Sequence, residues 1–323
     1  MPALTLSIVV PCYNEEDVLF ELHRRVTSVC KERSITSYEL ILVNDGSKDS
    51  TWKIMKDLSL SDNHVVAINL ARNYGHQIAL SAGLKMCRGE RIFVLDSDLQ
   101  DPPELLPKMM ARMDEGFDVV FGQRIKREGE TFFKKFSAFL FYRLLNRLTD
   151  ISIPEDAGDF RLMNRKTVEI LNNMPEHFRF IRGMVSWIGL RQEAFHYERS
   201  SRFAGKTKYP FSKMLRFAID AITGFSIRPL RIATYLGFIF SIITLILMLY
   251  ALTEYFTGET IKGWTSLAVI VLFVSSSQMF IIGIMSEYLG RLYIESKGRP
   301  LFLIQEVVSS EELITSIKQH YHL

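Results

Sequence analysis

The sequence predicts an α/β protein, in which a largely parallel β-sheet with helices on its faces is followed by two transmembrane helices. Short apolar segments alternate with segments of helical spacing through the N-terminal half, as they do in βαβ units. Two long uncharged runs lie in the C-terminal third, and each is long enough to cross a bilayer. The 323 residues are 48% hydrophobic and 23% charged, so the soluble part can bury a sizeable core.

The predicted strands and helices alternate along the chain. Apolar runs bounded by turn residues predict strands at residues 4–11, 38–44, 64–70 and 91–96. Helical spacing predicts helices at residues 16–31, after a turn within 45–58, and at residues 75–86. Because a helix connects each strand to the next, the strands are expected to run parallel. A further short strand is predicted after Pro300, in "LFLIQEVV".

Polar residues follow several of these strands. Asp45, Asp96 and Asp98 come after the second and fourth strands, and "PCYNE", residues 11–15, ends the first. Ligands of such sheets bind beyond the carboxyl ends of the strands, so these residues are expected at one ligand-binding edge. A dinucleotide is disfavoured because "PCYNEE" has no glycine. An ATPase is disfavoured because "AGKT", residues 204–207, lacks the first glycine of a phosphate loop.

The acidic segment "VLDSDLQDPPE", residues 94–104, predicts a metal site. Asp96 and Asp98 project from the same face of an extended chain, with Cα atoms about 6.6 Å apart, and can share one divalent cation. Mg²⁺ and Mn²⁺ suit this pair because both favour oxygen ligands and keep positions open for phosphate. Asp101 and Glu104 predict a helix start, with Asp101 as N-cap, a proline at the first helical position and Glu104 closing a capping box.

The two uncharged runs predict membrane spans at about 232–253 and 264–288. The alternative is a pair of buried core helices. The connection between the runs carries Lys262 as its only basic residue, whereas several basic residues flank their outer ends: Arg228, Arg231, Arg291, Lys297 and Arg299. By the positive-inside rule, both chain ends are therefore expected to face the cytoplasm.

Other features narrow the class of protein. The formal net charge of +3 gives no argument for nucleic-acid binding. Three cysteines, without paired metal-ligand spacing, fit a reduced, cytosol-facing domain. The N-terminus shows neither a basic leader nor a cleavage site, so no signal peptide is expected.

Two amphipathic, basic segments at residues 132–148 and 209–226 are expected to lie in the headgroup plane of a membrane. The alternative is packing against the soluble domain or a neighbouring subunit. The predicted organisation is a soluble domain, a juxtamembrane helix, the two spans and a cytoplasmic tail, at residues 1–208, 209–228, 229–292 and 293–323.

Five segments, in this order, carry a resemblance to a known family: "SIVVPCYNEE", "ILVNDGSKDST", "LARNYGHQIALSAGL", "VLDSDLQDPPE" and "GDFRLM". They resemble inverting family 2 glycosyltransferases with a GT-A fold, and more narrowly the polyprenyl-phosphate glycosyltransferases that include dolichol-phosphate mannose synthase. With the two spans and "MSEYLGRLYIESKGRP", the chain is most similar to bactoprenol glucosyltransferases of O-antigen modification. The resemblance covers Leu6 to Val307.

The resemblance implies roles for particular residues on the donor side. Four residues match positions that hold the uridine of a UDP-sugar: Pro11, Tyr13, Glu15 and Asp45. Asp96 matches the first acid of the metal motif and also belongs to the donor site. Asp98 and Gln100 match the residues that contact a Mg²⁺ or Mn²⁺ ion.

The resemblance also implies residues for phosphate binding and sugar transfer. Arg124 in "FGQR" matches an arginine near the phosphates, with a surface charge as the alternative. Asp159 matches an acid at the transfer site, with a buried helix cap as the alternative. It is expected to orient the acceptor or to take its proton. A basic loop matches a phosphate-contacting segment, with a solvated loop as the alternative, and holds Arg202, Lys206 and Lys208.

The implied activity is the metal-dependent, inverting transfer of one sugar, glucose by preference, from a UDP-sugar to undecaprenyl phosphate. N-acetylhexosamine and aminoarabinose donors remain open. A processive polysaccharide synthase is disfavoured because the chain has two spans and no Gln-x-x-Arg-Trp segment. An alternative that is not an enzyme is an inactive scaffold that recruits a lipid flippase. The resemblance further implies a homo-oligomer, a tetramer, in the bacterial cytoplasmic membrane, with a flippase as a possible partner and no nucleic acid.

Overall fold

The computed structural model describes residues 4–125, 154, 157–198, 223–224, 226–257 and 263–309. The chain divides into two compact units, which are described separately. The first comprises Met1–Tyr142, Ile151–Phe211 and Pro300–Leu323, and the second comprises Arg143–Asp150 and Ser212–Arg299. The predicted amphipathic segment 132–148, most of 209–226 and the predicted domain boundary at residue 208 lie outside the described residues.

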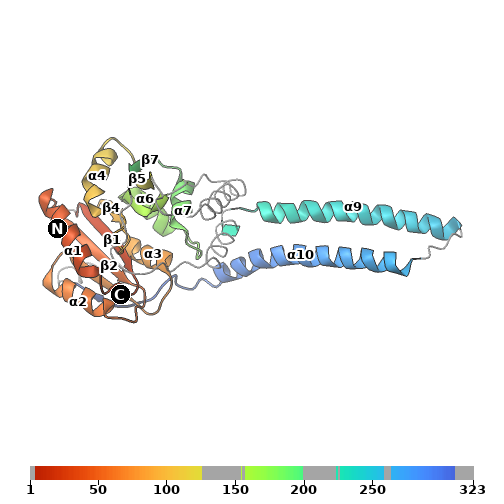
Figure 1. Cartoon of the computed structure of the whole chain (residues 1–323), viewed down its shortest axis with the longest axis horizontal. Helices are drawn as coiled ribbons and strands as arrows, with labels where there is room; N and C mark the ends of the chain where they lie inside the picture. The colour runs from red at the N-terminus through yellow and green to blue at the C-terminus, as the bar shows by residue number, and fades with distance from the viewer. Residues whose placement is uncertain are drawn as a thin grey trace. The chain divides into compact units, whose positions relative to one another are not determined.

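A mixed sheet forms the centre of the first unit (Figure 1). Among the described residues it has eight strands, in the order β7-β5-β6-β4-β1-β2-β3-β8. The strands are β1 (Leu6–Cys12), β2 (Tyr38–Asn44), β3 (Val65–Leu70), β4 (Arg91–Val94), β5 (Val119–Arg124), β6 (Ala157–Asn164), β7 (Gln192–Tyr197) and β8 (Ile304–Val308). The neighbours β4, β1, β2 and β3 are parallel, as predicted. β6 is antiparallel to both β4 and β5, and β7 is parallel to β5.

Helices cover both faces of this sheet. They are α1 (Leu19–Glu32), α2 (Thr51–Ser61), α3 (His76–Met86), the 3-10 helix η1 (Pro103–Leu105), α4 (Leu106–Asp114), α6 (Arg165–Asn173) and α7 (Ile181–Ile188). Alternate side chains of a strand point to opposite faces. Ile8 and Val10 of β1 pack in a cluster with residues of α1, α2 and α4. Val9 faces α3, where a Cβ added at Gly83 would lie 2.3 Å from its Cγ1. The strand is therefore buried on both sides.

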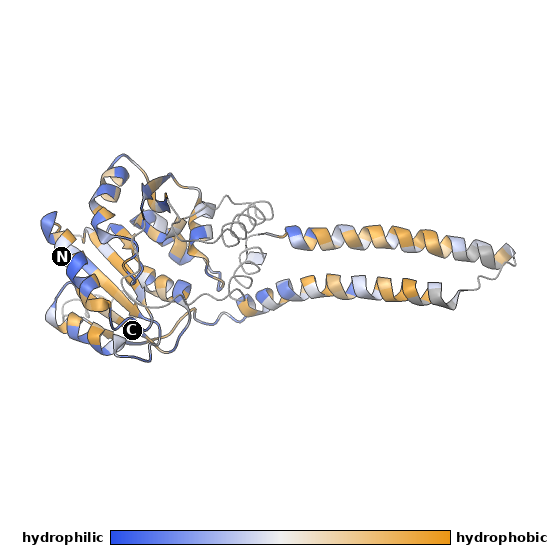
Figure 2. Ribbon diagram, in the orientation of Figure 1, coloured by the Kyte–Doolittle hydropathy of each residue, from blue (hydrophilic) through white to orange (hydrophobic). Residues whose placement is uncertain are grey.

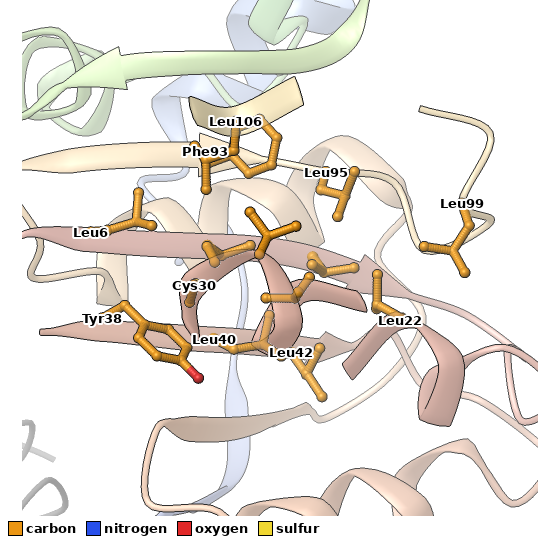
Figure 3. Close-up of a cluster of buried hydrophobic side chains, with 14 of the residues drawn as sticks. Leu6, Leu22, Cys30, Tyr38, Leu40, Leu42, Phe93, Leu95, Leu99 and Leu106 are labelled. Carbon is orange, nitrogen blue, oxygen red and sulfur yellow. The ribbon is translucent and has the colours of Figure 1, made fainter. Parts of the chain in front are cut away.

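A cluster of buried hydrophobic side chains lies on the α1 side of the sheet (Figure 3). Leu22 of α1 is fully buried there together with Leu40 of β2 and Phe93 of β4. Phe93 meets Phe160 of β6 edge to face, with ring centroids 5.2 Å apart, a favourable aromatic geometry. Such close packing fixes the strands, and it therefore fixes the points at which the loops leave their carboxyl ends.

The second unit contains two long apolar helices, α9 (Arg228–Thr257) and α10 (Trp264–Ser296). Both are long and apolar enough to cross a membrane, over Arg228–Tyr250 and Val269–Ser296. Figure 2 shows hydrophobic residues along most of each helix. Only 6% and 0% of the two spans are buried, which argues against buried core helices. Phe240 and Phe273 join the helices edge to face, with centroids 5.4 Å apart.

The strand predicted after Pro300 is confirmed as β8, and it belongs to the first unit. It pairs antiparallel with β3 at the edge of the sheet. Residues that the sequence places in a C-terminal tail thus complete the sheet after the chain has passed through the two apolar helices.

Candidate active site

The carboxyl ends of β1, β2 and β4 bring the predicted donor-side residues to one edge of the sheet. Pro11 is buried within β1, and Tyr13 and Glu15 follow that strand and are half-buried. Asp45 directly follows β2, and Asp96 lies two residues beyond β4. Because β1 pairs in parallel with both β2 and β4, these residues leave the sheet in the same direction.

Hydrogen bonds between two loops fix the segment that carries Tyr13 and Glu15. Asn14 adopts a left-handed conformation with φ 54°, which asparagine tolerates better than most residues. The backbone N–H of Asn14 donates to the Ser47 hydroxyl at 3.0 Å, and that of Glu15 donates to the Thr51 hydroxyl at 2.8 Å. The loop after β1 is therefore held against the loop after β2.

Asp45 holds the segment that leads into α3, a role that sequence reasoning did not identify. Its carboxylate is 3% exposed and accepts the backbone N–H groups of Tyr74 at 2.7 Å and Gly75 at 2.9 Å. Asn73 donates its side-chain amide to the Asp45 carbonyl at 2.9 Å. Burial raises the pKa of Asp45, and the two N–H donors oppose that rise.

Asp159 lies at the centre of a polar cluster built from three elements. It is the third residue of β6, so the alternative of a helix cap is wrong. Arg182 of α7 donates through Nε to Oδ1 at 2.9 Å, and Gln77 of α3 donates to Oδ2 at 2.8 Å. Burial acts to raise the Asp159 pKa, but Arg182 and His76 outweigh it and hold that pKa well below its usual range.

His76 connects Asp159 with the predicted metal motif. Its Nε2 lies 3.2 Å from Oδ2 of Asp159 and 3.5 Å from Oδ1 of Asp96. Burial would lower the His76 pKa, yet the hydrogen bond to Asp159 and the two negative charges raise it to about 9. The ligand atoms of these three residues lie within 4.8 Å of one another.

The loop after β4 presents the carboxylates of the predicted metal motif. Asp98 and Gln100 are half-buried, and Oδ1 of Asp98 accepts the backbone N–H of Gln100 at 3.2 Å. Burial is the main cause that raises the Asp96 pKa to about 6, against the effect of His76. The Asp96 Oδ1 atom is buried and accepts no hydrogen bond from the part of the chain that the structure describes. A buried acceptor beside a second carboxylate fits a hard divalent cation.

Asp101 is a buried acid with tertiary partners, so its prediction as a helix N-cap is wrong. It is 0% exposed, and the Tyr197 hydroxyl donates to its Oδ1. The 3-10 helix begins at Pro103 without a side-chain cap. Glu104 forms an ion pair with Arg25 of α1 at 2.6 Å, so it does not close a capping box. A buried carboxylate needs a hydrogen-bond donor, and the Tyr197 hydroxyl supplies one.

Arg124 ends β5 close to Asp101, with 3.7 Å between Nη2 and Oδ2. Its side chain is 24% exposed, so the alternative of a freely solvated surface charge does not describe it. The basic loop with Arg202, Lys206 and Lys208 lies outside the described residues.

Sequence reasoning missed His76, Gln77 and Arg182. A signal existed for the first two, because they begin the helix that follows the third strand of a parallel sheet, at the edge where ligands bind. Arg182 lies in α7 with no recognisable motif around it, and only the tertiary structure brings it to Asp159.

Comparison with known proteins places these residues in a family. Residues 7–171 match the model of glycosyl transferase family 2. The uncharacterized glycosyltransferase YkcC of Bacillus subtilis (strain 168) is 47% identical over 97% of this chain and 97% of its own length. The prophage bactoprenol glucosyl transferase homolog of Escherichia coli (strain K12) is 38% identical over 94% of this chain and 99% of its own length. The bactoprenol glucosyl transferase of Shigella phage SfV is 36% identical over 94% and 98%.

Among solved structures, the glucosyl-3-phosphoglycerate synthase of Mycobacterium tuberculosis in complex with Mn²⁺, UDP and phosphoglyceric acid is 18% identical, with a TM-score of 0.45. The match covers 68% of this chain and 76% of that one.

Proposed function

Because the chain belongs to glycosyl transferase family 2, we propose that it transfers a single glucose, with inversion, from UDP-glucose to undecaprenyl phosphate. The observation that carries this proposal is the meeting of Asp96 and Asp159 at His76, within 3.5 Å and 3.2 Å of its Nε2. Asp96, of the predicted metal motif, and Asp159, of the proposed transfer site, thus share His76 as a neighbour. Bactoprenol glucosyl transferases at 36–38% identity over nearly the full length support the choice of acceptor and sugar.

The donor nucleotide binds, in this proposal, at the edge formed by the loops after β1 and β2. Tyr13 packs on the uracil ring, and Glu15 accepts from the ribose hydroxyls. Pro11 shapes the floor of the site from within β1. Asp45 fixes residues 73–75 through the backbone N–H groups that its two oxygens accept, and the remaining lone pairs of these oxygens can accept from the uridine.

Asp96, Asp98 and Gln100 would hold a Mg²⁺ or Mn²⁺ ion, for which their oxygen donors are suited. When bound, such an ion supplies positive charge that stabilises the departing diphosphate. Arg124 adds a fixed guanidinium toward the same diphosphate, since it is mostly covered and held near Asp101.

Asp159 orients the acceptor side of the site in this proposal. The lipid phosphate is already an anion at neutral pH, so its attack on the anomeric carbon needs no strong base. The Asp159 carboxylate instead keeps Arg182 and His76 in fixed places. These two cations, with Arg202, Lys206 and Lys208 of the basic loop, attract the phosphate to the donor sugar.

We further propose that α9 and α10 form a hairpin through the bacterial cytoplasmic membrane, with the catalytic unit and both chain ends in the cytoplasm. The course of the chain supports this topology, because β8 after α10 pairs with β3 of the unit that precedes α9. We also propose that the chain assembles as a homo-oligomer, a tetramer, and that it has a lipid flippase as a partner. Both statements rest on the resemblance alone.

The test is mass spectrometry of the lipid product formed by the purified chain from undecaprenyl phosphate and a panel of UDP-sugars. A hexosyl product from UDP-glucose alone is the expected result. A product from UDP-N-acetylhexosamine or an aminoarabinose donor would change the sugar but keep the reaction. No transfer from any donor would favour the scaffold for a flippase.

Metal dependence has its own test. Asp98→Asn should lower turnover by roughly 10²-fold or more, because the cation loses a charged ligand. Excess chelator should abolish wild-type turnover, and added Mg²⁺ or Mn²⁺ should restore it. Full activity of Asp98→Asn, or of the wild type in chelator, would contradict the metal site. Circular dichroism serves as the control for an intact fold.

A further inference from the structure

Arg124 is surrounded by side chains that leave its guanidinium little freedom. It ends β5, which pairs in parallel with β7, and its partner in register is Tyr197. On the other side, β5 pairs antiparallel with β6. The guanidinium therefore lies beside the ends of two strands and close to the loop that carries Asp101.

The two carboxylate oxygens of Asp101 face two different side chains, Tyr197 and Arg124. The Tyr197 hydroxyl donates to Oδ1, and Nη2 of Arg124 lies 3.7 Å from Oδ2. Asp101 is 0% exposed, so its charge acts on the guanidinium with little screening by water. By taking one oxygen, Tyr197 sets the orientation of the carboxylate and directs the other oxygen to Arg124.

Two glycines provide the room that this arrangement needs. A Cβ added at Gly158 of β6 would lie 2.9 Å from Nη2 of Arg124. A Cβ added at Gly122 of β5 would lie 2.8 Å from Cε1 of Tyr197 and 2.5 Å from Cδ1 of Phe160. All three distances are too short for a real contact, so the guanidinium and the tyrosine ring occupy space that a side chain at either glycine would need.

We propose that Asp101 and Tyr197 are positioning residues, which hold the Arg124 guanidinium in the one orientation that contacts the diphosphate of the donor. This inference rests on the proposed function, in which Arg124 serves the diphosphate. The physical basis is that an arginine side chain has many rotamers. A guanidinium that is already fixed in the free protein loses less conformational freedom when the diphosphate binds. Asp101 also lies one residue after Gln100, so the same contact ties the predicted metal loop to β5 and β7.

The test is calorimetric binding of UDP and of uridine to the full-length chain in detergent. Tyr197→Phe removes one hydroxyl and should weaken UDP binding by about 5- to 10-fold. Uridine has no phosphate, so its affinity should not change. Gly158→Ala, which displaces Nη2 from the other side, should give the same selective loss. A matched control is Tyr38→Phe, a buried tyrosine of β2, which should bind both ligands as the wild type does.

A double-mutant cycle separates positioning from a general structural effect. Arg124→Ala should weaken UDP binding more than Tyr197→Phe does, and adding Tyr197→Phe to Arg124→Ala should have no further effect. If Tyr197→Phe weakens UDP equally in both backgrounds, or weakens uridine as much as UDP, the inference is overturned. If Arg124→Ala leaves UDP affinity unchanged, the assignment of Arg124 to the diphosphate falls, while glucosyl transfer remains testable by its product.

Discussion

At the scale of single residues, Gln77 connects three elements around Asp159. Its side-chain N–H donates to Oδ2 of Asp159 at 2.8 Å, and its side-chain carbonyl accepts the backbone N–H of Ile181 at 2.9 Å. One amide of α3 thus links β6 with the first residue of α7, the helix that carries Arg182. The two contacts require a neutral side chain that donates to the Asp159 carboxylate and accepts from the Ile181 N–H, and an amide does both.

Gln77→Glu should therefore be more damaging than its small change in shape suggests. It places a second carboxylate against the buried charge of Asp159 and removes the donor. We expect Tm to fall by about 5 °C or more and turnover to fall by at least about 10-fold. Gln77→Met is the matched control, because it loses both hydrogen bonds but adds no charge, and it should be milder. Equal effects of the two substitutions in thermal unfolding would show that charge is not the cause.

Asp159→Asn tests the role of the Asp159 charge in transfer. Asparagine keeps the size of the side chain but loses the charge that holds Arg182 and His76. Turnover should fall by roughly 10²-fold or more, while UDP affinity stays close to that of the wild type. Steady-state kinetics in both substrates and calorimetric UDP binding measure the two effects. Loss of UDP binding with normal turnover at saturation would place Asp159 outside the transfer site.

At the scale of helices and strands, the parallel part of the sheet was predictable because local patterns determine it. Runs such as "YELILVN", short, apolar and bounded by turn residues, are typical of a strand that is buried on both faces, and β2 has the predicted bounds, Tyr38–Asn44. Since chain direction then fixes which ends carry the acids, the placement of Asp45 and Asp96 followed as well.

The partners of those acids were not predictable in the same way. Tyr197 and Asp101 are 96 residues apart in sequence, and Gln77 and Ile181 are 104 apart. Their contacts depend on the insertion of β6 antiparallel between β4 and β5, which no local pattern specifies. The capping-box pattern at Asp101 was a local signal that a tertiary contact with Tyr197 overrides.

The contact between α3 and β1 gives a prediction for stability. A Cβ at Gly83 would lie 2.3 Å from Cγ1 of Val9, so Gly83→Ala should destabilise the first unit by about 1–3 kcal/mol through overpacking. Val9→Ala removes that methyl and should relieve the clash in the double variant. Chemical denaturation of the single and double variants measures the coupling, and simple additivity of the two effects would contradict the close contact.

At the scale of the whole molecule, the chain returns from the apolar helices to complete the sheet of the first unit. Leu303 accepts the backbone N–H of Ala71 at 2.9 Å, and Ser59 donates to the carbonyl of Val308 at 2.8 Å. Glu306 pairs with Lys56 of α2 at 2.7 Å. These contacts cover the edge of β3 just before the segment 73–75 that Asp45 holds, so β8 supports the donor side of the site without contributing a site residue.

Two truncations that both keep α9 and α10 should therefore behave differently. A chain that ends after Gly298 lacks β8, so the backbone groups of β3 are exposed at an open edge. Its Tm should fall by at least about 5 °C, and its UDP affinity should fall with it, although every proposed site residue is present. A chain that ends after Ser309 keeps β8 and is the matched control, expected to bind UDP as the full chain does. Thermal unfolding and calorimetry in the same detergent compare the two. Equal stability of the two truncations would mean that β8 is dispensable and that β3 can serve as the edge of the sheet.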